Sequence, residues 1–122
     1  MIVGDDAEGI AGAALYRELE GPAVVELESI AVALRHRGQG GGVADELFHE
    51  VLARIDERAV LNRIASVIVT GRIYGLNVPS QRMALRARMR HVDTFDNGVQ
   101  EWMLNLPTSI VDEHDDDPPA LF

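Results

Sequence analysis

The sequence predicts a single mixed domain of the α/β (α+β) class, with a central, mostly antiparallel sheet and helices packed against it. Alternating or β-branched segments bounded by turns occur at both ends of the chain. Between two of them lies a segment with helical periodicity. With 122 residues, of which 47% are apolar, the chain is long enough for one hydrophobic core and too short for two ordinary domains.

The first part of the chain predicts strands joined by tight turns. Residues 10–19 form a candidate strand that follows the turn-forming sequence DDAEG. Glu20, Gly21 and Pro22 then predict a tight turn, so a hairpin with the next strand, residues 23–32, is expected.

Strand 23–32 does not alternate regularly. Strict alternation would put Leu27 and Ile30 on opposite faces. A β-bulge near Glu28 and Ser29 would put both on the same face. The alternative is a strand buried on both sides, and the sequence leaves both interpretations open.

The pattern becomes helical from Gly40 to about Arg58, where Val43, Leu47 and Val51 recur every four residues. Residues 64–70 predict a buried, β-branched strand, and residues 71–77 a loop. Residues 78–89 predict a shorter helix. Residues 91–95 and 99–106, around the turn DNG, predict a closing hairpin. The predicted order is β-β-β-α-β-α-β-β.

The charge distribution separates a domain, residues 1–107, from an acidic tail, residues 108–122, that is expected to be mobile. The net charge is −9, and without the five acids of the segment VDEHDDD it would be −4. This balance disfavours nucleic acid as a partner. The chain has no cysteine, and no apolar run in it is long enough to span a membrane, so a cytoplasmic protein is expected. No cluster has the spacing of metal ligands.

A glycine-rich segment precedes the long predicted helix. Gly38 and the glycines at 40–42 would let the backbone form a concave nest at the start of the helix, where unpaired N–H groups and the helix dipole favour an anion. Arg35 and Arg37 add positive charge, so a phosphate or pyrophosphate site is one interpretation. A glycine-rich turn with solvated arginines is the other. The dinucleotide pattern G-x-G-x-x-G would need glycine at Val43, and the P-loop needs a lysine, which the chain lacks.

Residues 35–40, Arg-His-Arg-Gly-Gln-Gly, match the pattern R/Q-x-x-G-x-G/A, which resembles the acyl-CoA pyrophosphate motif of the GNAT N-acetyltransferase superfamily. The surrounding segment LESIAVALRHRGQGGGVADELF is similar to the strand-loop-helix core of that family. NVPSQRMALRARM resembles its second signature and EWMLNLP its last strand. The resemblance covers residues 2–107.

The resemblance implies acetyl-CoA as cosubstrate and an amine as acceptor. Val32 falls where the family offers a backbone donor to the acetyl carbonyl. Glu26 and Glu28, on the same strand, are candidate general bases, Glu26 being closer to the family's usual position; both could equally be ordinary solvent-facing acids. The implied cofactor-binding residues are Ile30, Val32, Arg35, Arg37, Gly38, Gln39, Gly40, Gly41, Gly42, Asn77 and Ser80.

The chain also departs from the family pattern. The family's usual first strand and two helices have no counterpart, so the domain is expected to be N-terminally truncated. The open sheet that would result predicts a homodimer. Ala84 stands where the family commonly has a tyrosine that protonates the leaving thiolate. Arg88 and Met89 stand at the usual Gly-Phe. Tyr74 is a candidate replacement acid, although a surface tyrosine is the simpler interpretation.

Three functional hypotheses follow. The first is an N-acetyltransferase that moves an acetyl group from acetyl-CoA to a primary amine of a small molecule or peptide. The second is a catalytically weak or inactive acyl-CoA-binding or partner module of the same fold, which the alanine at position 84 favours. The third is a half-domain that completes its sheet with a second chain.

Overall fold

The computed structural model describes residues 2–6, 8–32 and 41–110. Within these ranges the strands and helices follow the predicted order. Their bounds are β1 Ile2–Asp6, β2 Gly9–Glu18, β3 Val24–Val32, α1 Gly42–Leu61, β4 Ser66–Tyr74, α2 Val78–Arg86, β5 Arg90–Thr94 and β6 Val99–Pro107. The strands form one sheet in the order β1-β2-β3-β4-β6-β5, in which β3 and β4 pair in parallel and the other neighbours are antiparallel. The predicted mixed, mostly antiparallel fold class is confirmed.

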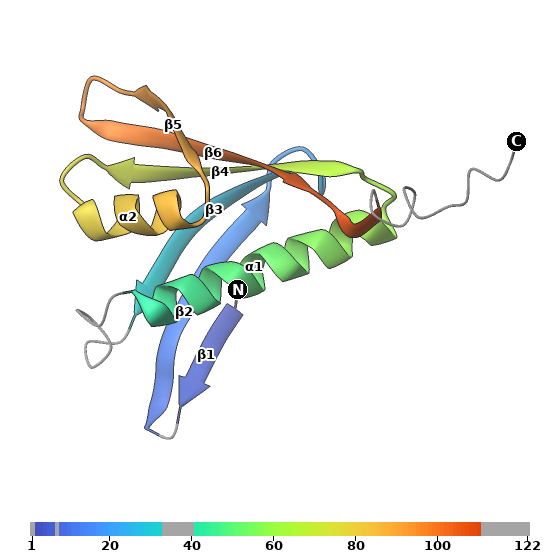
Figure 1. The fold of residues 1–122 in the computed structure, drawn as a ribbon, viewed down its shortest axis with the longest axis horizontal. Coiled ribbons are helices and arrows are strands. Elements are labelled where there is room, and N and C mark those ends of the chain that lie inside the picture. The colour runs from blue at the N-terminus through green and yellow to red at the C-terminus, as the bar shows by residue number, and fades with distance from the viewer. Residues whose placement is uncertain (1, 7, 33–40, 111–122) are drawn as a thin grey trace, which may run out of the picture.

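The two central strands, β3 and β4, separate part of the way along their length (Figure 1). Their pairing runs from Val24 opposite Ile68 to Leu27 opposite Gly71. Beyond this point β3 continues to Val32 and β4 to Tyr74, without pairing to each other. Backbone groups along these two facing edges are therefore not used by a β3–β4 ladder.

A β-bulge lies at the point of separation. Leu15 of β2 is opposite Ser29 and Tyr16 is opposite Leu27, so Glu28 is the additional residue in β3. As a result Leu27 and Ile30 both pack against the core. Of the two interpretations that the sequence left open, the bulge is correct. A bulge increases the local twist, which turns β3 away from β4 after Leu27.

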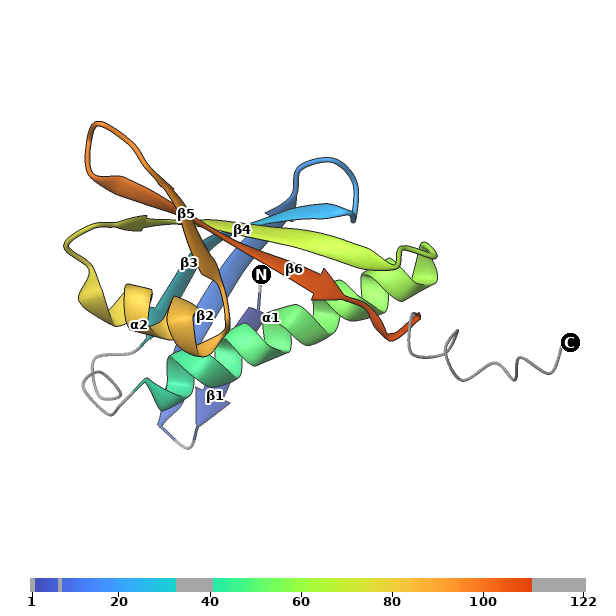
Figure 2. The same ribbon diagram turned by 45° about the horizontal axis from the view of Figure 1, so that its top comes forward.

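Both helices pack on one face of the sheet, which we call the helix face, and the opposite side is the outer face (Figure 2). Val25, Val67 and Val69 point to the helix face and form a cluster with the buried side of α1. A second cluster brings Phe48 of α1 against Met83 of α2. The core therefore lies between the sheet and α1, and α2 covers the part of the sheet next to β4 and β6.

Strand β4 is longer than predicted. Residues 71–74, which the sequence predicted as a loop, pair with residues 99–102 of β6. That prediction was wrong because Gly71 and Arg72 interrupt the apolar run, whereas the backbone ladder with β6 forms regardless of side-chain polarity. After β4, Gly75 contacts the β5–β6 turn, where its N–H donates to the carbonyl of Gly98 at 3.0 Å.

Helix α2 ends three residues before the predicted end at Met89. Its C-cap is Ala87, after which Arg88 takes the left-handed conformation with φ 65°. Arg88 N–H donates to the carbonyl of Leu85, and Met89 N–H to that of Ala84, which together form a Schellman motif. Met89 then turns into the second cluster. The position that favours glycine is therefore present, but an arginine occupies it.

We expect Arg88→Gly to raise the free energy of unfolding by roughly 0.5–1 kcal/mol. Relief of the left-handed strain on a residue with a Cβ is worth about 1–2 kcal/mol, and the greater chain entropy of glycine offsets part of it. Urea denaturation provides the measurement. Arg90→Gly, in the extended strand β5, is the matched control and should destabilise the protein. A loss of stability in Arg88→Gly as large as that in the control would contradict the strain argument.

The packed domain continues beyond residue 107. Thr108 is buried and donates its hydroxyl to the carbonyl of Ile64 at 2.7 Å. Ser109 N–H donates to the Asp56 carboxylate on α1, also at 2.7 Å. Residues 108 and 109 of the predicted tail are thus attached to the domain, while residues 111–122, with the acidic run, lie outside the described part of the chain.

Candidate functional site

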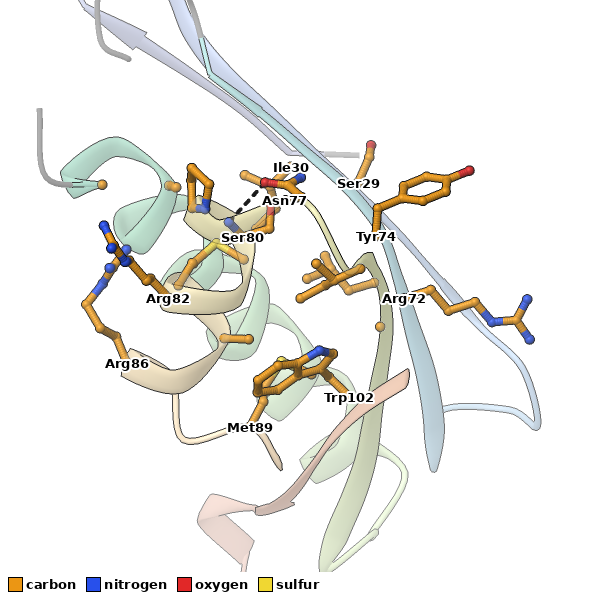
Figure 3. A pocket seen from close by; sticks show the side chains of 18 of the residues that line it. Ser29, Ile30, Arg72, Tyr74, Asn77, Ser80, Arg82, Arg86, Met89 and Trp102 are labelled. Atoms are coloured by element: carbon orange, nitrogen blue, oxygen red, sulfur yellow. Dashed lines mark hydrogen bonds between the residues drawn. The ribbon is translucent and has the colours of Figure 1, made fainter. Parts of the chain in front are cut away.

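A cleft of about 950 Å³ opens where β3 and β4 separate. Leu27 and Ile30 line it from the helix-face side of β3, and Ser29 lines it from the outer-face side of the same strand. On β4, Ile73 lines the cleft from the helix-face side and Tyr74 lines it from the outer-face side. Because side chains from both faces line one cavity, the cleft extends through the sheet. Figure 3 shows Ser29, Arg72 and Tyr74 on one side of it and Arg82 and Arg86 on the other, next to the helices.

The helix-face end of the cleft meets the first turn of α1. Gly41 is the N-cap, with φ 83°, and no side chain caps the helix. The N–H groups of the first turn lack the partners that later turns have, and the helix dipole adds partial positive charge there. These are the properties that the sequence assigned to an anion site. Gly41 lines the cleft and Gly42 is the first residue of α1, whereas Arg35, Arg37, Gly38, Gln39 and Gly40 lie outside the described residues.

An ion pair between the helices holds this end of the cleft together. Arg86 of α2 reaches Asp45, in the first turn of α1, with Nε 2.9 Å from one carboxylate oxygen and Nη2 2.9 Å from the other. The hydrogen bond with Asp45 raises the pKa of the Arg86 guanidinium. A Cβ added at Gly41 would overlap Nη2 of Arg86. The left-handed backbone favours glycine at position 41, whereas the overlap involves only the end of an exposed side chain, which can move away.

The start of α2 forms another wall of the cleft. Asn77 caps the helix, its side-chain oxygen accepting the N–H of Ser80 at 3.2 Å (Figure 3). Both residues line the cleft, so two of the sequence-predicted cofactor residues are brought to it. Gln81 supports the turn before the helix by donating to the carbonyl of Gly75 at 2.8 Å.

Charged side chains from β2, β3 and β4 lie at or beside the outer-face end, and Arg72 of β4 is one of them. Arg17 of β2 is opposite Glu26 in the ladder, and the bulge places Glu28 within reach of the same guanidinium. Arg17 Nε lies 2.9 Å from a Glu28 oxygen, and its Nη2 lies 3.5 Å from a Glu26 oxygen. Glu28 lines the cleft, whereas Glu26 is not among its lining residues. Of the two candidate bases, Glu28 thus has the better access to the cleft.

Position 84 is closed to solvent. Ala84 is 0% exposed and packs in the second cluster with Phe48, Met89 and Trp102. Ala84 also lines the cleft, so a longer side chain at this position would extend toward it. Tyr74 lines the cleft from the outer-face side and is 69% exposed.

The remaining sequence-predicted residues are placed as follows. Val32 ends β3 and is paired in register with Gly12 of β2. No cluster of three metal-ligating side chains occurs in the described ranges. The sequence did not indicate Arg17, nor the ion pair between Asp45 and Arg86, because each depends on contacts between different elements.

Among the described residues no helix has the length and apolar character needed to cross a membrane.

No family model matches the sequence, and no curated protein matches it. Solved structures do match the fold. Nourseothricin acetyltransferase is 20% identical, with a TM-score of 0.63 over 86% of this chain and 62% of that chain. A GNAT-family acetyltransferase from Listeria monocytogenes 4b F2365 is 14% identical, with a TM-score of 0.57 over 85% and 63%. The NatC complex bound to Gag peptide and CoA is 12% identical, with a TM-score of 0.60 over 85% and 65%.

At these identities the likeness is one of fold, and the chain has the GNAT acyl-CoA N-acyltransferase-like fold. It spans 62–65% of the length of these three chains.

Proposed function

We propose that the chain is a GNAT-superfamily N-acetyltransferase that moves the acetyl group of acetyl-CoA to a primary amine of a small molecule or peptide. The observation that carries this proposal is the cleft through the sheet at the bulge of β3. It connects an uncapped helix N-terminus on one face with a carboxylate on the other. The motif at residues 35–40 and the fold support it independently.

The cofactor enters this scheme from the helix face. Its pyrophosphate would lie against the backbone at residues 38–42, with Arg35 and Arg37 adding charge. Asn77 and Ser80 would border the pantetheine, and Ile30 the acyl end. The NatC structure, which has this fold, contains CoA.

The acceptor would approach from the outer face. Its amine nitrogen attacks the thioester carbon, a C–N bond forms and the C–S bond breaks. Glu28, directly or through a water molecule, takes the proton that the amine loses. A backbone N–H of β3 beyond the last pair with β4 stabilises the developing oxyanion, and the resemblance points to Val32 for this role. CoA leaves as the thiolate and takes up a proton.

The source of that last proton distinguishes the two candidate functions. Ala84 has no proton to donate, which favours the alternative, an acyl-CoA-binding or partner module with weak or no turnover. In the enzyme, water or Tyr74 would protonate the thiolate, or it would leave without assistance. Acid assistance is typically worth about 10²–10⁴ in rate, so we expect slow turnover.

Steady-state turnover of acetyl-CoA with a panel of primary amines, beside calorimetric titration of acetyl-CoA alone, tests the proposal. Acetylation of at least one amine supports the enzyme. Binding of acetyl-CoA without acetylation of any amine would replace the enzyme by the binding module. If acetyl-CoA does not bind and no amine is acetylated, the enzyme and the binding module are both excluded.

We also expect the protein to form a homodimer in the cytoplasm. Strand β1 is at the edge of the sheet, and Val3, Ile10, Leu15 and Ile68 expose apolar surface. Light scattering at high micromolar concentration is expected to give twice the chain mass. A single chain mass under these conditions would contradict the dimer.

A further inference from the structure

The ion-pair group of Arg17, Glu26 and Glu28 lies one step from the point where the cleft opens. Glu26 is opposite Thr70 of β4, and the β3–β4 pairing ends at the next residue, Leu27. Glu28 follows as the bulge residue and lines the cleft. Arg17 is not among the lining residues, but its guanidinium reaches the edge of the cleft through its ion pair with Glu28, which is one of them.

The exposures show which member faces solvent. The Arg17 side chain is 60% exposed, against 26% for Glu26 and 30% for Glu28. Arg17 is thus the most exposed member of this group and is open to an acceptor that approaches from the outer face. The two ion pairs use Nε and Nη2, so the donors on Nη1 take no part in them.

The ion-pair group should bind acceptors with different affinity according to the charges that they carry. The ammonium of a simple amine can pair with Glu28, but such an amine offers no carboxylate to the donors on Nη1 of Arg17. An α-amino acid carries a carboxylate beside its ammonium. The carboxylate can accept hydrogen bonds from Arg17 while the ammonium meets Glu28, so each charge faces an opposite one.

We propose that Arg17 binds the carboxylate of the acceptor, and that the acceptor is an α-amino acid or a similar zwitterion with adjacent charges. This inference rests on the proposed function and narrows its acceptor. Arg17 acts as a specificity-determining residue, and Glu28 remains the group that takes the proton.

The test compares three forms of one acceptor. The common amino acids are screened first, and the best is compared with its carboxamide and with the amine that lacks the carboxyl group. The wild type is expected to prefer the acid over both by about 10- to 100-fold in kcat/KM, mainly through KM, as a charge-assisted hydrogen bond implies. Arg17→Met should reduce this ratio to near one, and Arg17→Lys should restore part of it. Acetyl-CoA affinity should not change.

Arg54→Met is the matched control, because Arg54 is also an exposed arginine paired with a glutamate, Glu50, but on α1. It should keep the wild-type ratio. Equal rates for acid, amide and amine in the wild type would overturn the role of Arg17 but leave the proposed acetyltransferase function standing. An Arg17→Met variant that slows all three equally would have the same consequence. Binding of acetyl-CoA without acetylation of any panel member would overturn the proposed function and this inference with it.

Discussion

Gly41→Val is expected to weaken acetyl-CoA binding by about 100-fold or more. Gly41 has φ 83°, a conformation that a β-branched residue adopts only with strain. The new side chain would also overlap the guanidinium of Arg86, which Asp45 holds in place. The Arg86 side chain can move away, but the strain at the N-cap would change the local backbone, and the N–H groups proposed to bind the pyrophosphate would move with it. Loss of about two charge-assisted hydrogen bonds accounts for a change of this size. Calorimetric titration with acetyl-CoA measures it.

Gly98→Val separates the effect on the site from the effect on the backbone. Gly98 has φ 85° and lies in the β5–β6 turn, where a Cβ meets no atom within 4 Å. Both variants should lose stability by a similar amount, since both force valine into the left-handed region. Only Gly41→Val should lose acetyl-CoA. Equal affinity in the two variants would place the pyrophosphate elsewhere.

The fold could be predicted where local pattern and tertiary packing agree. The helix around Val51 has the periodicity of its burial, and it is in place. The β-branched strand before Thr70 is also in place, but it is buried on one face only, since Ile68 is 38% exposed. The bulge at Glu28 could be stated only as an alternative, because two apolar residues three apart are compatible with burial on both sides. The structure shows the bulge because Leu15 and Tyr16 of β2 pair with Ser29 and Leu27, which leaves Glu28 without an opposite residue.

Contacts between elements are the part that the sequence did not reveal. Arg17 meets Glu26 because the hairpin turn sets their register, and a count outward from that turn would have paired them. Arg86 meets Asp45 only because α2 packs beside the start of α1, which no local pattern encodes. Arg88 at a glycine position illustrates a third case, in which the Schellman hydrogen bonds maintain a conformation that the residue type disfavours.

Glu28→Gln is expected to lower kcat by about 10²–10⁴, with little change in acetyl-CoA affinity, because it removes a proton acceptor and no phosphate contact. Glutamine keeps the size and an acceptor oxygen, and it leaves Arg17 one carboxylate partner, Glu26. Glu26→Gln is the closest comparison and should have the smaller effect, since Glu26 does not line the cleft. Glu50→Gln, on the exposed side of α1, controls for the loss of an ion-paired glutamate far from the cleft.

The pH dependence gives this prediction a signature that a structural defect would not produce. The base is needed most when the acceptor is an ammonium, and an α-amino group has a pKa of about 8. Above that pH the free amine predominates without help from Glu28, so the difference between wild type and Glu28→Gln should narrow between pH 7 and pH 9. A rate ratio that stays constant over this range would argue against Glu28 as the group that takes the proton. A larger loss in Glu26→Gln would transfer that role to Glu26.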